Sequence, residues 1–443
     1  MTVSHKYKSP AVIGLLALLV LASAIGTFSA NQHWATGGSL CRKLLEAHPG
    51  HADVLAFKAR IITGTEGLSA ALKLLTETPL LKGRRTDAYF NALGTVQYLR
   101  RDWDAAYNTF DRISSPSRFA SGARVMQAHV LFQQGLPQEA LQILEGCLEA
   151  DPRNWDAARA KGMYFFRQKK WFEAGAAYSA AIDAGRRDVT TLRPFIIAME
   201  HLGDEHDAVG KPGTARRAYF MALGGLEQLP RRAQSGLNYR LQRVSIMVKA
   251  EDVKGALGIF RDLEGDLGKY DAEERMRVRK EFAFFCMKFM LFKKADELFA
   301  DIRAAEPGNP DHIFWQATAK YKRRHLGDAE KMFREAMNLY RQRANARGVL
   351  LARHNLAEID LFVKDYARAA DTFRELVGEV PDSWQARANL AEALIRQGEF
   401  EEGAAIIREL ADKIPESSFS LIKLRAMLAK EKRHEQSLAR HSD

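Results

Sequence analysis

The chain repeats one pattern of small and large residues with a period of 34 residues. Gly94 precedes Phe110 by 16 residues, and Gly162 precedes Tyr178 by the same interval. The two glycines lie 68 residues apart, which is twice the period. A unit of this length is one supersecondary element that cannot bury its apolar face alone, so the units must stack. The repeat therefore predicts one long array rather than about three separate globular domains, the other organisation that 443 residues allow.

Five positions of the repeat hold the same kind of residue along most of the chain. Position 8 is small or apolar: Ala59, Gly94, Ala128, Gly162, Gly203, Val244, Ala283, Ala317, Ala357 and Ala391. Position 20 is Ala71, Ala106, Ala140, Ala174, Ala215, Ala256, Ala295, Ala329, Ala369 and Gly403. Position 24 is large: Leu75, Phe110, Leu144, Tyr178, Tyr219, Phe260, Phe299, Phe333, Phe373 and Ile407. Aromatic residues recur at position 17 (Trp103, Trp171, Phe292, Tyr366 and Phe400) and proline at position 32 (Pro152, Pro307, Pro381 and Pro415).

This lattice predicts two helices in each unit. Small residues at positions 8 and 20 let the two helix backbones approach closely, and the large residue at position 24 fills the space between a unit and its neighbour. Proline at position 32 cannot continue the second helix, so it marks the turn into the next unit.

The pattern resembles the tetratricopeptide repeat, and the resemblance covers residues 52–417. The ten units are 52–86, 87–120, 121–154, 155–188, 196–229, 237–270, 276–309, 310–343, 350–383 and 384–417. The resemblance implies an all-α fold, a right-handed α-solenoid of about ten helix pairs. The related 35-residue repeat that reads RNA fits less well, because the period here is 34 and proline recurs at position 32.

Several segments depart from the regular repeat. Residues 31–51 are interpreted as a linker and a degenerate half-repeat, and residues 418–443 as a capping helix with a polar tail. Extra residues separate units at 189–195, 230–236, 271–275 and 344–349. The unit at 196–229 has Lys211-Pro212-Gly213 where its second helix should start, so its register is the hardest to assign.

A short tail, residues 1–10, precedes an uncharged run of 20 residues at 11–30. As a helix this run spans about 30 Å, the thickness of a bilayer core, and we expect an N-terminal transmembrane helix that acts as a signal anchor. A signal peptide cleaved after Ala22-Ser23-Ala24 is the alternative. Lys6 and Lys8 precede the run, which favours a cytoplasmic amino terminus. The layout indicates a bacterial cytoplasmic (inner) membrane crossed once, with the array in the periplasm.

Composition and motifs indicate a protein that is not an enzyme. The three cysteines are far apart, so there is no disulfide framework and no CxxC motif. His201 and His206 are five residues apart, so on a helix they project about 140° from each other and cannot share one metal ion. Phosphate-binding loops, dinucleotide fingerprints and nucleophile elbows are missing. We therefore predict no catalytic residue, no cofactor and no metal site.

In the tetratricopeptide family, positions 2, 5, 9 and 12 of each first helix point into a concave groove. The resemblance implies a groove lined by Asn91, Tyr98, His129, Phe132, Arg159, Met163 and Phe166, and farther along by Lys280, Phe314, Tyr321, His354 and Glu358. Such a mixture suits a peptide or a helix of a partner protein. For each aromatic residue the alternative is a place in the core between units. The set with which the family's best-known readers clamp a C-terminal carboxylate does not recur in adjacent units, so that specificity is not predicted.

The segment 321–353 is locally basic, with nine cations against three acids. Its candidate patch is Lys322, Arg323, Arg324, Arg341, Arg343 and Arg347. An anionic polymer, a lipid headgroup surface or an acidic partner fits this charge, and a solvated face is the plain alternative. Nucleic acid is disfavoured, because the nearby aromatic residues fall at core positions.

Two hypotheses of function follow from these features. The first is a membrane-tethered scaffold or adaptor that binds partner proteins through its concave groove in envelope complex assembly. The alternative is a subunit of a polysaccharide synthesis or export system whose basic groove contacts an anionic glycan.

Overall fold

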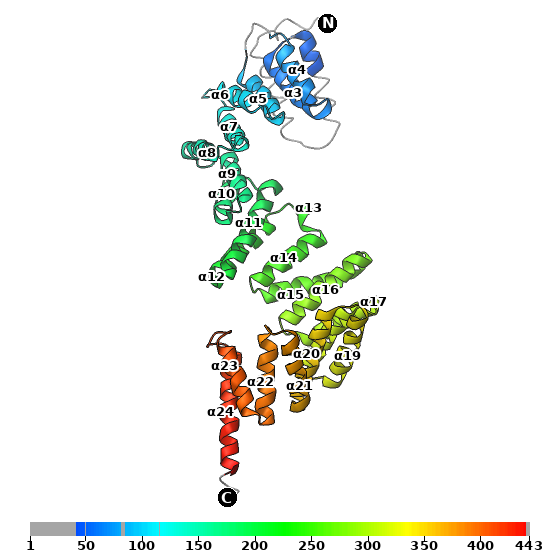
Figure 1. Ribbon diagram of the computed structural model, residues 1–443. Coiled ribbons are helices and arrows are strands. Elements are labelled where there is room, and N and C mark those ends of the chain that lie inside the picture. The colour runs from blue at the N-terminus through cyan, green and yellow to red at the C-terminus, as the bar shows by residue number, and fades with distance from the viewer. Residues whose placement is uncertain (1–40, 49, 81–84, 115, 440–443) are drawn as a thin grey trace. The chain divides into compact units, whose positions relative to one another are not determined.

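A computed structural model describes residues 41–48, 50–80, 85–114 and 116–439, and these ranges contain helices and no strands. The all-α prediction is confirmed. Ten helix pairs follow in chain order (Figure 1): α3 (Ala52–Thr65) and α4 (Leu68–Glu77), α5 (Asp87–Leu99) and α6 (Trp103–Asp111), α7 (Ala120–Gln134) and α8 (Pro137–Ala150), α9 (Trp155–Arg167) and α10 (Trp171–Asp183), α11 (Val189–Ala208) and α12 (Pro212–Glu227), α14 (Leu237–Lys249) and α15 (Val253–Gly265), α16 (Ala272–Lys288) and α17 (Phe292–Ala305), α18 (Pro310–Lys322) and α19 (Leu326–Gln342), α20 (Ala346–Phe362) and α21 (Tyr366–Glu379), α22 (Trp384–Gln397) and α23 (Phe400–Ala411). Three further elements are α13 (Arg231–Gln234), the 3₁₀ turn η3 (Leu267–Lys269) and the last helix, α24 (Phe419–Ala439).

The extra residues between units mostly lengthen the first helix of the following unit. α11 begins at Val189, so residues 189–195 add about two turns to its amino end. α16 and α20 begin at Ala272 and Ala346 and absorb their junctions in the same way. Residues 230–236 instead contain the short helix α13.

In nine of the ten described units, the residue at position 15 has a positive φ and turns the chain from the first helix to the second. These residues are Arg101, Gly135, Lys169, Gly210, Glu251, Met290, Arg324, Lys364 and Gly398. Six of them are not glycine, although the left-handed region costs such residues about 1–2 kcal/mol. Helix packing, rather than the turn residue, therefore dictates this geometry. In the unit at 196–229, Gly210 holds position 15 and Pro212 begins α12, a place that proline favours.

The small residue at position 8 lies against the large residue at position 24 of the same unit. A Cβ added to Gly94 would lie 2.8 Å from the ring of Phe110, and one added to Gly162 would lie 3.0 Å from the ring of Tyr178. Ala174, at position 20, is completely buried. The large residue therefore also fills space within its own unit, between the two paired helices, which the sequence did not predict. Phe260 shows the predicted contact between units, since its ring stacks on Phe282 of the next unit at 4.6 Å.

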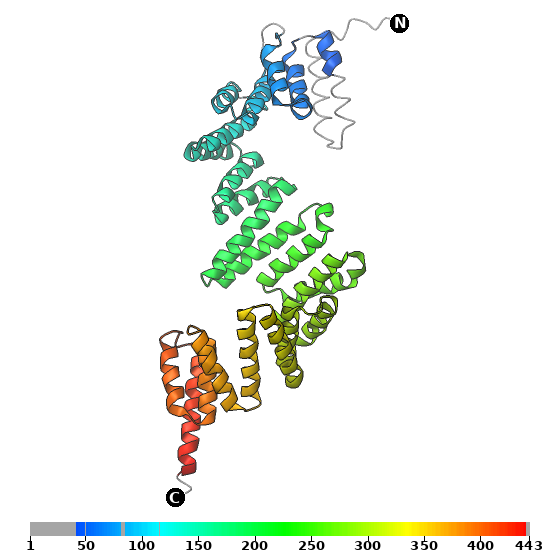
Figure 2. The ribbon, with the colours of Figure 1, turned by 45° about the vertical axis from the view of Figure 1, so that its right-hand side comes forward.

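The described residues divide into two compact parts, each of which contains several of the 34-residue units. We call the part that ends at Glu251 unit 1 and the part that begins at Asp252 unit 2. Each unit has its own buried core. In unit 2, the last helix, α24, covers the apolar face of α22 and α23 through Leu421 and Leu424 (Figure 2). The first described residues of unit 1, 41–47, are helical, and Cys41 among them is buried.

The expected membrane anchor at residues 11–30 lies outside the described residues. Within the ranges that the structure does describe, no helix combines the length and the apolar character needed to cross a membrane.

Candidate partner-binding surfaces

The predicted groove residues of unit 1 lie half-buried on three successive first helices that contact one another. Asn91 and Tyr98 lie on α5, His129 and Phe132 on α7, and Arg159, Met163 and Phe166 on α9. On α9 the last three repeat at i, i+4 and i+7, and Arg167 continues the same face. His129 and Phe132 of α7 lie close to side chains of α9. We call the surface predicted from all seven residues the unit 1 groove.

Basic side chains meet in the unit 1 groove. Burial, together with the positive charges of Arg159 and Arg167, lowers the pKa of His129 to about 4, so its imidazole is neutral at pH 7. Burial raises the pKa of the nearby Tyr178 to about 12, against the opposing effect of the same two arginines. Arg159 Nη2 lies 3.3 Å from Asp156 Oδ1, while its buried Nε has no hydrogen-bond partner. Arg167 forms no ion pair within the described part of the chain, so donors remain for an incoming acid.

Aromatic rings lie beside these cations. Phe132 on α7 stacks on Tyr164 of α9, with ring centroids 4.6 Å apart and planes 10° apart. Phe166 meets Trp171 edge to face at 5.4 Å, and Trp171 stacks on His201 at 4.5 Å. The rings thus form two groups, one between α7 and α9 and one that joins α9, α10 and α11.

Two of the predicted groove residues in unit 2 have other roles. Phe314 is only 7% exposed and packs edge to face against Phe333 at 5.4 Å, so it belongs to the core between the two helices of its own repeat and not to a binding surface. Its ring is long enough to reach past the helix face into the space between α18 and α19. Lys280 Nζ lies 3.0 Å from Glu306, and Glu306 also lies 3.5 Å from His312 Nδ1. Lys280 is therefore held by its own chain.

Three other predicted residues of unit 2 join one polar network across α18, α20 and α22. His354 Nε2 lies 3.5 Å from Glu358 Oε1, and Asn389 Nδ2 lies 3.4 Å from the same oxygen. Tyr321 hydrogen-bonds Glu358, and burial followed by this carboxylate raises the pKa of Tyr321 to about 12. Burial alone would raise the pKa of Glu358, but its partners and the charge of Lys322 hold that pKa below its usual value. The network fixes the spacing of the three first helices.

The basic segment does not form one patch, which corrects the sequence-based expectation. Lys322, Arg323 and Arg324 precede the amino end of α19, whereas Arg341, Arg343 and Arg347 lie at or beyond its carboxyl end. α19 has 17 residues and is therefore about 25 Å long. Arg323 pairs with the buried Asp296, and Arg343 Nη2 donates to the Gly308 carbonyl at 3.0 Å. A run that is contiguous in sequence is thus divided between two ends of a repeat, and part of it is structural.

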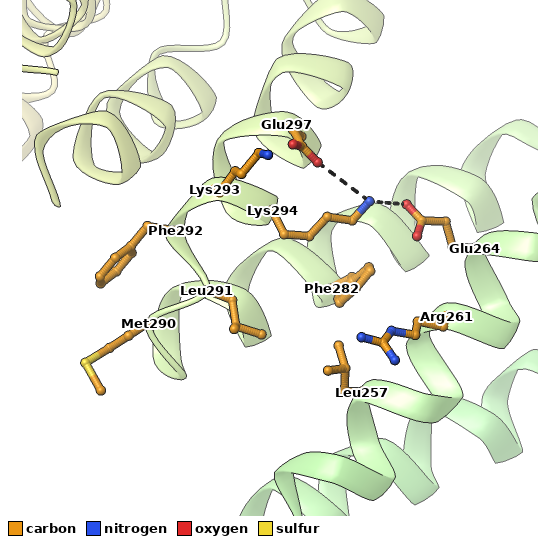
Figure 3. A pocket seen from close by; sticks show the side chains of 10 residues that line it. All are labelled: Leu257, Arg261, Glu264, Phe282, Met290, Leu291, Phe292, Lys293, Lys294 and Glu297. Carbon is orange, nitrogen blue, oxygen red and sulfur yellow. Dashed lines mark hydrogen bonds and ion pairs between the residues drawn. The ribbon is translucent and has the colours of Figure 1, made fainter. Parts of the chain in front are cut away.

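Unit 2 also has a hollow of about 570 Å³ that the repeat pattern did not predict (Figure 3). It is lined by Leu257, Arg261, Glu264, Phe282, Met290, Leu291, Phe292, Lys293, Lys294 and Glu297. Lys294 Nζ lies 2.7 Å from Glu264 and 3.9 Å from Glu297, so these charges compensate one another. The sequence signal of this hollow is the apolar run at 289–292, which crosses a turn where polar residues are expected.

The described residues give little indication of a metal site or of a reactive cysteine. Among the described residues, no group of three or more His, Cys, Asp and Glu side chains is arranged to hold a metal ion. The cysteines are buried, and burial raises the pKa of Cys41 to about 11 and that of Cys286 to about 12. Both side chains are therefore protonated thiols at neutral pH and poor nucleophiles.

Two family models described as tetratricopeptide repeat match the chain, one at residues 125–189 in unit 1 and one at residues 363–428 in unit 2. Both matches fall on the helix pairs of the 34-residue lattice. These two segments are therefore tetratricopeptide repeats, and helix pairs of this kind generally serve as protein-interaction scaffolds. Among curated proteins, none matches the chain.

Comparison with solved structures matches the chain to three crystal structures at low sequence identity. Yeast Tom70 is 12% identical, with 87% of this chain and 96% of that chain covered and a TM-score of 0.34. The TPR domain of P58(IPK) is 13% identical, with 79% and 99% covered and a TM-score of 0.29. Cut9-Hcn1 of the APC/C is 11% identical, with 96% and 90% covered and a TM-score of 0.37. Similarity at this level carries no conclusion about partners.

Proposed function

We propose that the chain is a membrane-tethered scaffold whose unit 1 groove binds an acidic, partly apolar segment of a partner protein. The observation that supports the proposal is the stacked pair Phe132 and Tyr164, which joins α7 to α9, together with Arg159 and Arg167 of α9, whose charges act on His129 of α7. The rings offer apolar contact area without much loss of side-chain freedom, and the guanidinium groups offer donors to carboxylates. His129 stays neutral at pH 7, so it adds a hydrogen-bonding group without further positive charge.

The setting belongs to the same proposal. The uncharged run at residues 11–30 would tether the scaffold to a bacterial cytoplasmic membrane with the array in the periplasm. Partners would then be components of an envelope assembly that the scaffold holds at the membrane surface.

The glycan-binding alternative has lost its main support. It required one continuous basic surface along residues 321–353, but the six cations of the candidate patch lie at two ends of α19. Of the other cations, Arg334 within α19 pairs with Glu330 at 2.8 Å, and Arg353 within α20 pairs with Glu375 at 2.6 Å. Arg323 is moreover committed to Asp296, so replacing it would test stability before it tested binding.

The test compares two charge reversals in the full-length chain. Arg167→Glu changes an exposed side chain in the unit 1 groove, and Arg187→Glu makes the same change in the exposed turn after α10. Tagged wild-type and variant chains are cross-linked in native membranes, purified in parallel and compared by quantitative mass spectrometry. We expect a set of partners that Arg187→Glu retains and Arg167→Glu loses, and that carries acidic segments.

Two outcomes would count against the proposal. Partners retained equally by both variants would exclude the unit 1 groove as the working surface. Partners lost equally from both would point to a general effect of net charge. A thermal melt of each variant, compared with wild type, shows whether a loss of partners comes from unfolding.

A further inference from the structure

Three successive turns of unit 2 lie at the same end of their repeats; the first and the third expose apolar side chains, and the second is basic. They are residues 288–293 between α16 and α17, 322–325 between α18 and α19, and 362–365 between α20 and α21, and we call them the turn edge. Met290 is 74% exposed, Val363 53% and Phe362 45%. Apolar side chains exposed to this extent on neighbouring turns commonly mark an interaction surface.

Contacts within unit 2 join the three turns into one edge. Arg323 at the end of α18 pairs with Asp296 in the first turns of α17. The Arg324 guanidinium carbon lies 4.1 Å from the centre of the Phe362 ring, which connects the second turn to the third. Met290, Arg324 and Lys364 all hold position 15 with a positive φ, so the three turns share one geometry.

The turn edge carries cations that form no ion pair, although Lys322 lies close enough to Glu358 to lower the pKa of that carboxyl. Lys288, Lys293, Lys322, Arg324 and Lys364 form no ion pair with any of the described residues. The acids nearby are engaged: Asp296 is buried with Arg323, and Asp328 lies 3.7 Å from Lys320. Asp365 lies 3.6 Å from Arg368 and caps α21. The edge therefore presents positive charge beside exposed apolar side chains.

The shape of the edge favours a flat partner. Figure 3 shows that Met290 and Phe292 extend away from Leu257 and Arg261. Leu291 instead points toward the side on which Leu257 and Arg261 lie. Apolar side chains that protrude from turns can enter the headgroup layer of a bilayer. The long, flexible cationic side chains around them can contact lipid phosphates, so the edge matches a bilayer surface. The uncharged run at residues 11–30 would keep such a surface within reach.

We propose that the turn edge of unit 2 docks on the surface of an anionic lipid bilayer, with Met290, Phe362 and Val363 in the headgroup layer and the surrounding cations against lipid phosphates. This role concerns a different surface and a different class of partner from the unit 1 groove, so either role can hold without the other. Docking at this edge would fix the orientation of unit 2 on the membrane.

The experiment reports contact at individual turns of the full-length chain. Met290→Cys and Val363→Cys are each labelled with an environment-sensitive fluorophore. The three native cysteines are buried, so labelling falls on the introduced thiol. Asp382→Cys is the matched control position, because its side chain is 99% exposed and lies in the turn at the opposite end of the repeat. Each chain is reconstituted into phosphatidylcholine vesicles with or without about a quarter phosphatidylglycerol.

We expect the emission of the probes at 290 and 363 to shift to shorter wavelength in the anionic vesicles and the probe at 382 to stay unchanged. The shift should shrink at about 1 M salt, because the screening length falls to about 3 Å. The pair Lys293→Glu/Arg324→Glu should lower the docked fraction at least about tenfold. The pair Arg341→Glu/Arg347→Glu makes the same charge change at the other end of α19 and should have little effect.

Other outcomes would overturn the proposal. Equal emission of the probes at 290 and 363 in neutral and anionic vesicles would exclude recognition of anionic lipid. A shift that appears only with native membranes and is abolished by protease would identify a protein as the occupant of the edge. Equal effects of the two double charge reversals would show that only net charge matters. Melting curves of the variants separate each of these results from unfolding.

Discussion

Gly203 on α11 lies directly against the ring of Tyr219 on α12, so close that a Cβ on the glycine would lie 2.3 Å from ring carbon Cε1. The ring cannot easily move aside. Tyr219 is 2% exposed, and its hydroxyl donates to Asp204 at 2.8 Å. Asp204 also lies 2.9 Å from Lys249 of α14. Position 8 and position 24 are therefore matched in size, and the match is held in place by charges on three helices.

This relationship predicts the effect of adding one methyl group. Gly203→Ala should destabilise unit 1 by about 1–3 kcal/mol, because it overpacks a contact that cannot relax. Gly224→Ala in α12 is the control, since nothing lies within 4 Å of a Cβ built there. It should stabilise by about 0.5–1 kcal/mol, because alanine is the better helix former. Urea denaturation of both variants measures the difference, and equal effects would refute the close contact.

The pKa of His129 predicts how the stability of unit 1 depends on pH. Its folded value of about 4 lies below the ordinary 6.5, so the unfolded chain takes up the proton first as the pH falls. The stabilisation is therefore complete above pH 6.5 and is lost progressively down to about pH 4. The loss amounts to about 3 kcal/mol at most. In His129→Asn the free energy of unfolding should fall less over this range, and parallel curves for variant and wild type would contradict the assignment.

The lattice was enough to predict the helix pairs, because each position 8, 20 and 24 has one packing role in every unit. Its limits appear where two residues share a position but not a role. Arg159 and Phe314 both hold position 5 of a first helix, yet the arginine is half-buried at the groove and the ring is in the core. Position 24 is aromatic in both units, as Tyr178 and Phe333, so the difference lies in the residue at position 5 itself. A phenyl ring can be buried without losing hydrogen bonds, whereas a guanidinium group needs partners or water, and a position rule inherited from a family does not take this into account.

The basic segment shows a second limit of sequence reading. Charge was summed along the chain, whereas a surface depends on where helices begin and end. With α19 bounded at Leu326 and Gln342, the same cations fall into two groups. The turn edge was missed for the opposite reason, because its three turns lie far apart in sequence and only contacts such as that of Arg324 with Phe362 join them.

Asp296 is the buried acid that compensates the charges of Lys320 and Arg323, where the basic segment begins. It is 7% exposed, accepts from Gln316 Nε2 at 3.1 Å and pairs with Arg323, and Lys320 lies 3.4 Å away. Asp296→Ala leaves two cations at a buried site without their acid, so it should destabilise unit 2 by about 3 kcal/mol or more. Asp328→Ala removes a mostly exposed carboxylate 3.7 Å from the same Lys320 and should cost less than about 1 kcal/mol.

Two buried thiols, one in each unit, can show where in the chain Asp296→Ala lowers stability. Cys286 lies in the core of α16 in unit 2, and Cys147 lies in α8 of unit 1. Repeats contact mainly their neighbours, so a local loss of stability should increase opening near the change more than far from it. In Asp296→Ala, a thiol reagent should therefore modify Cys286 faster than in wild type, while the rate at Cys147 stays nearly unchanged. Equal acceleration at both thiols would mean that the two units unfold as one cooperative body.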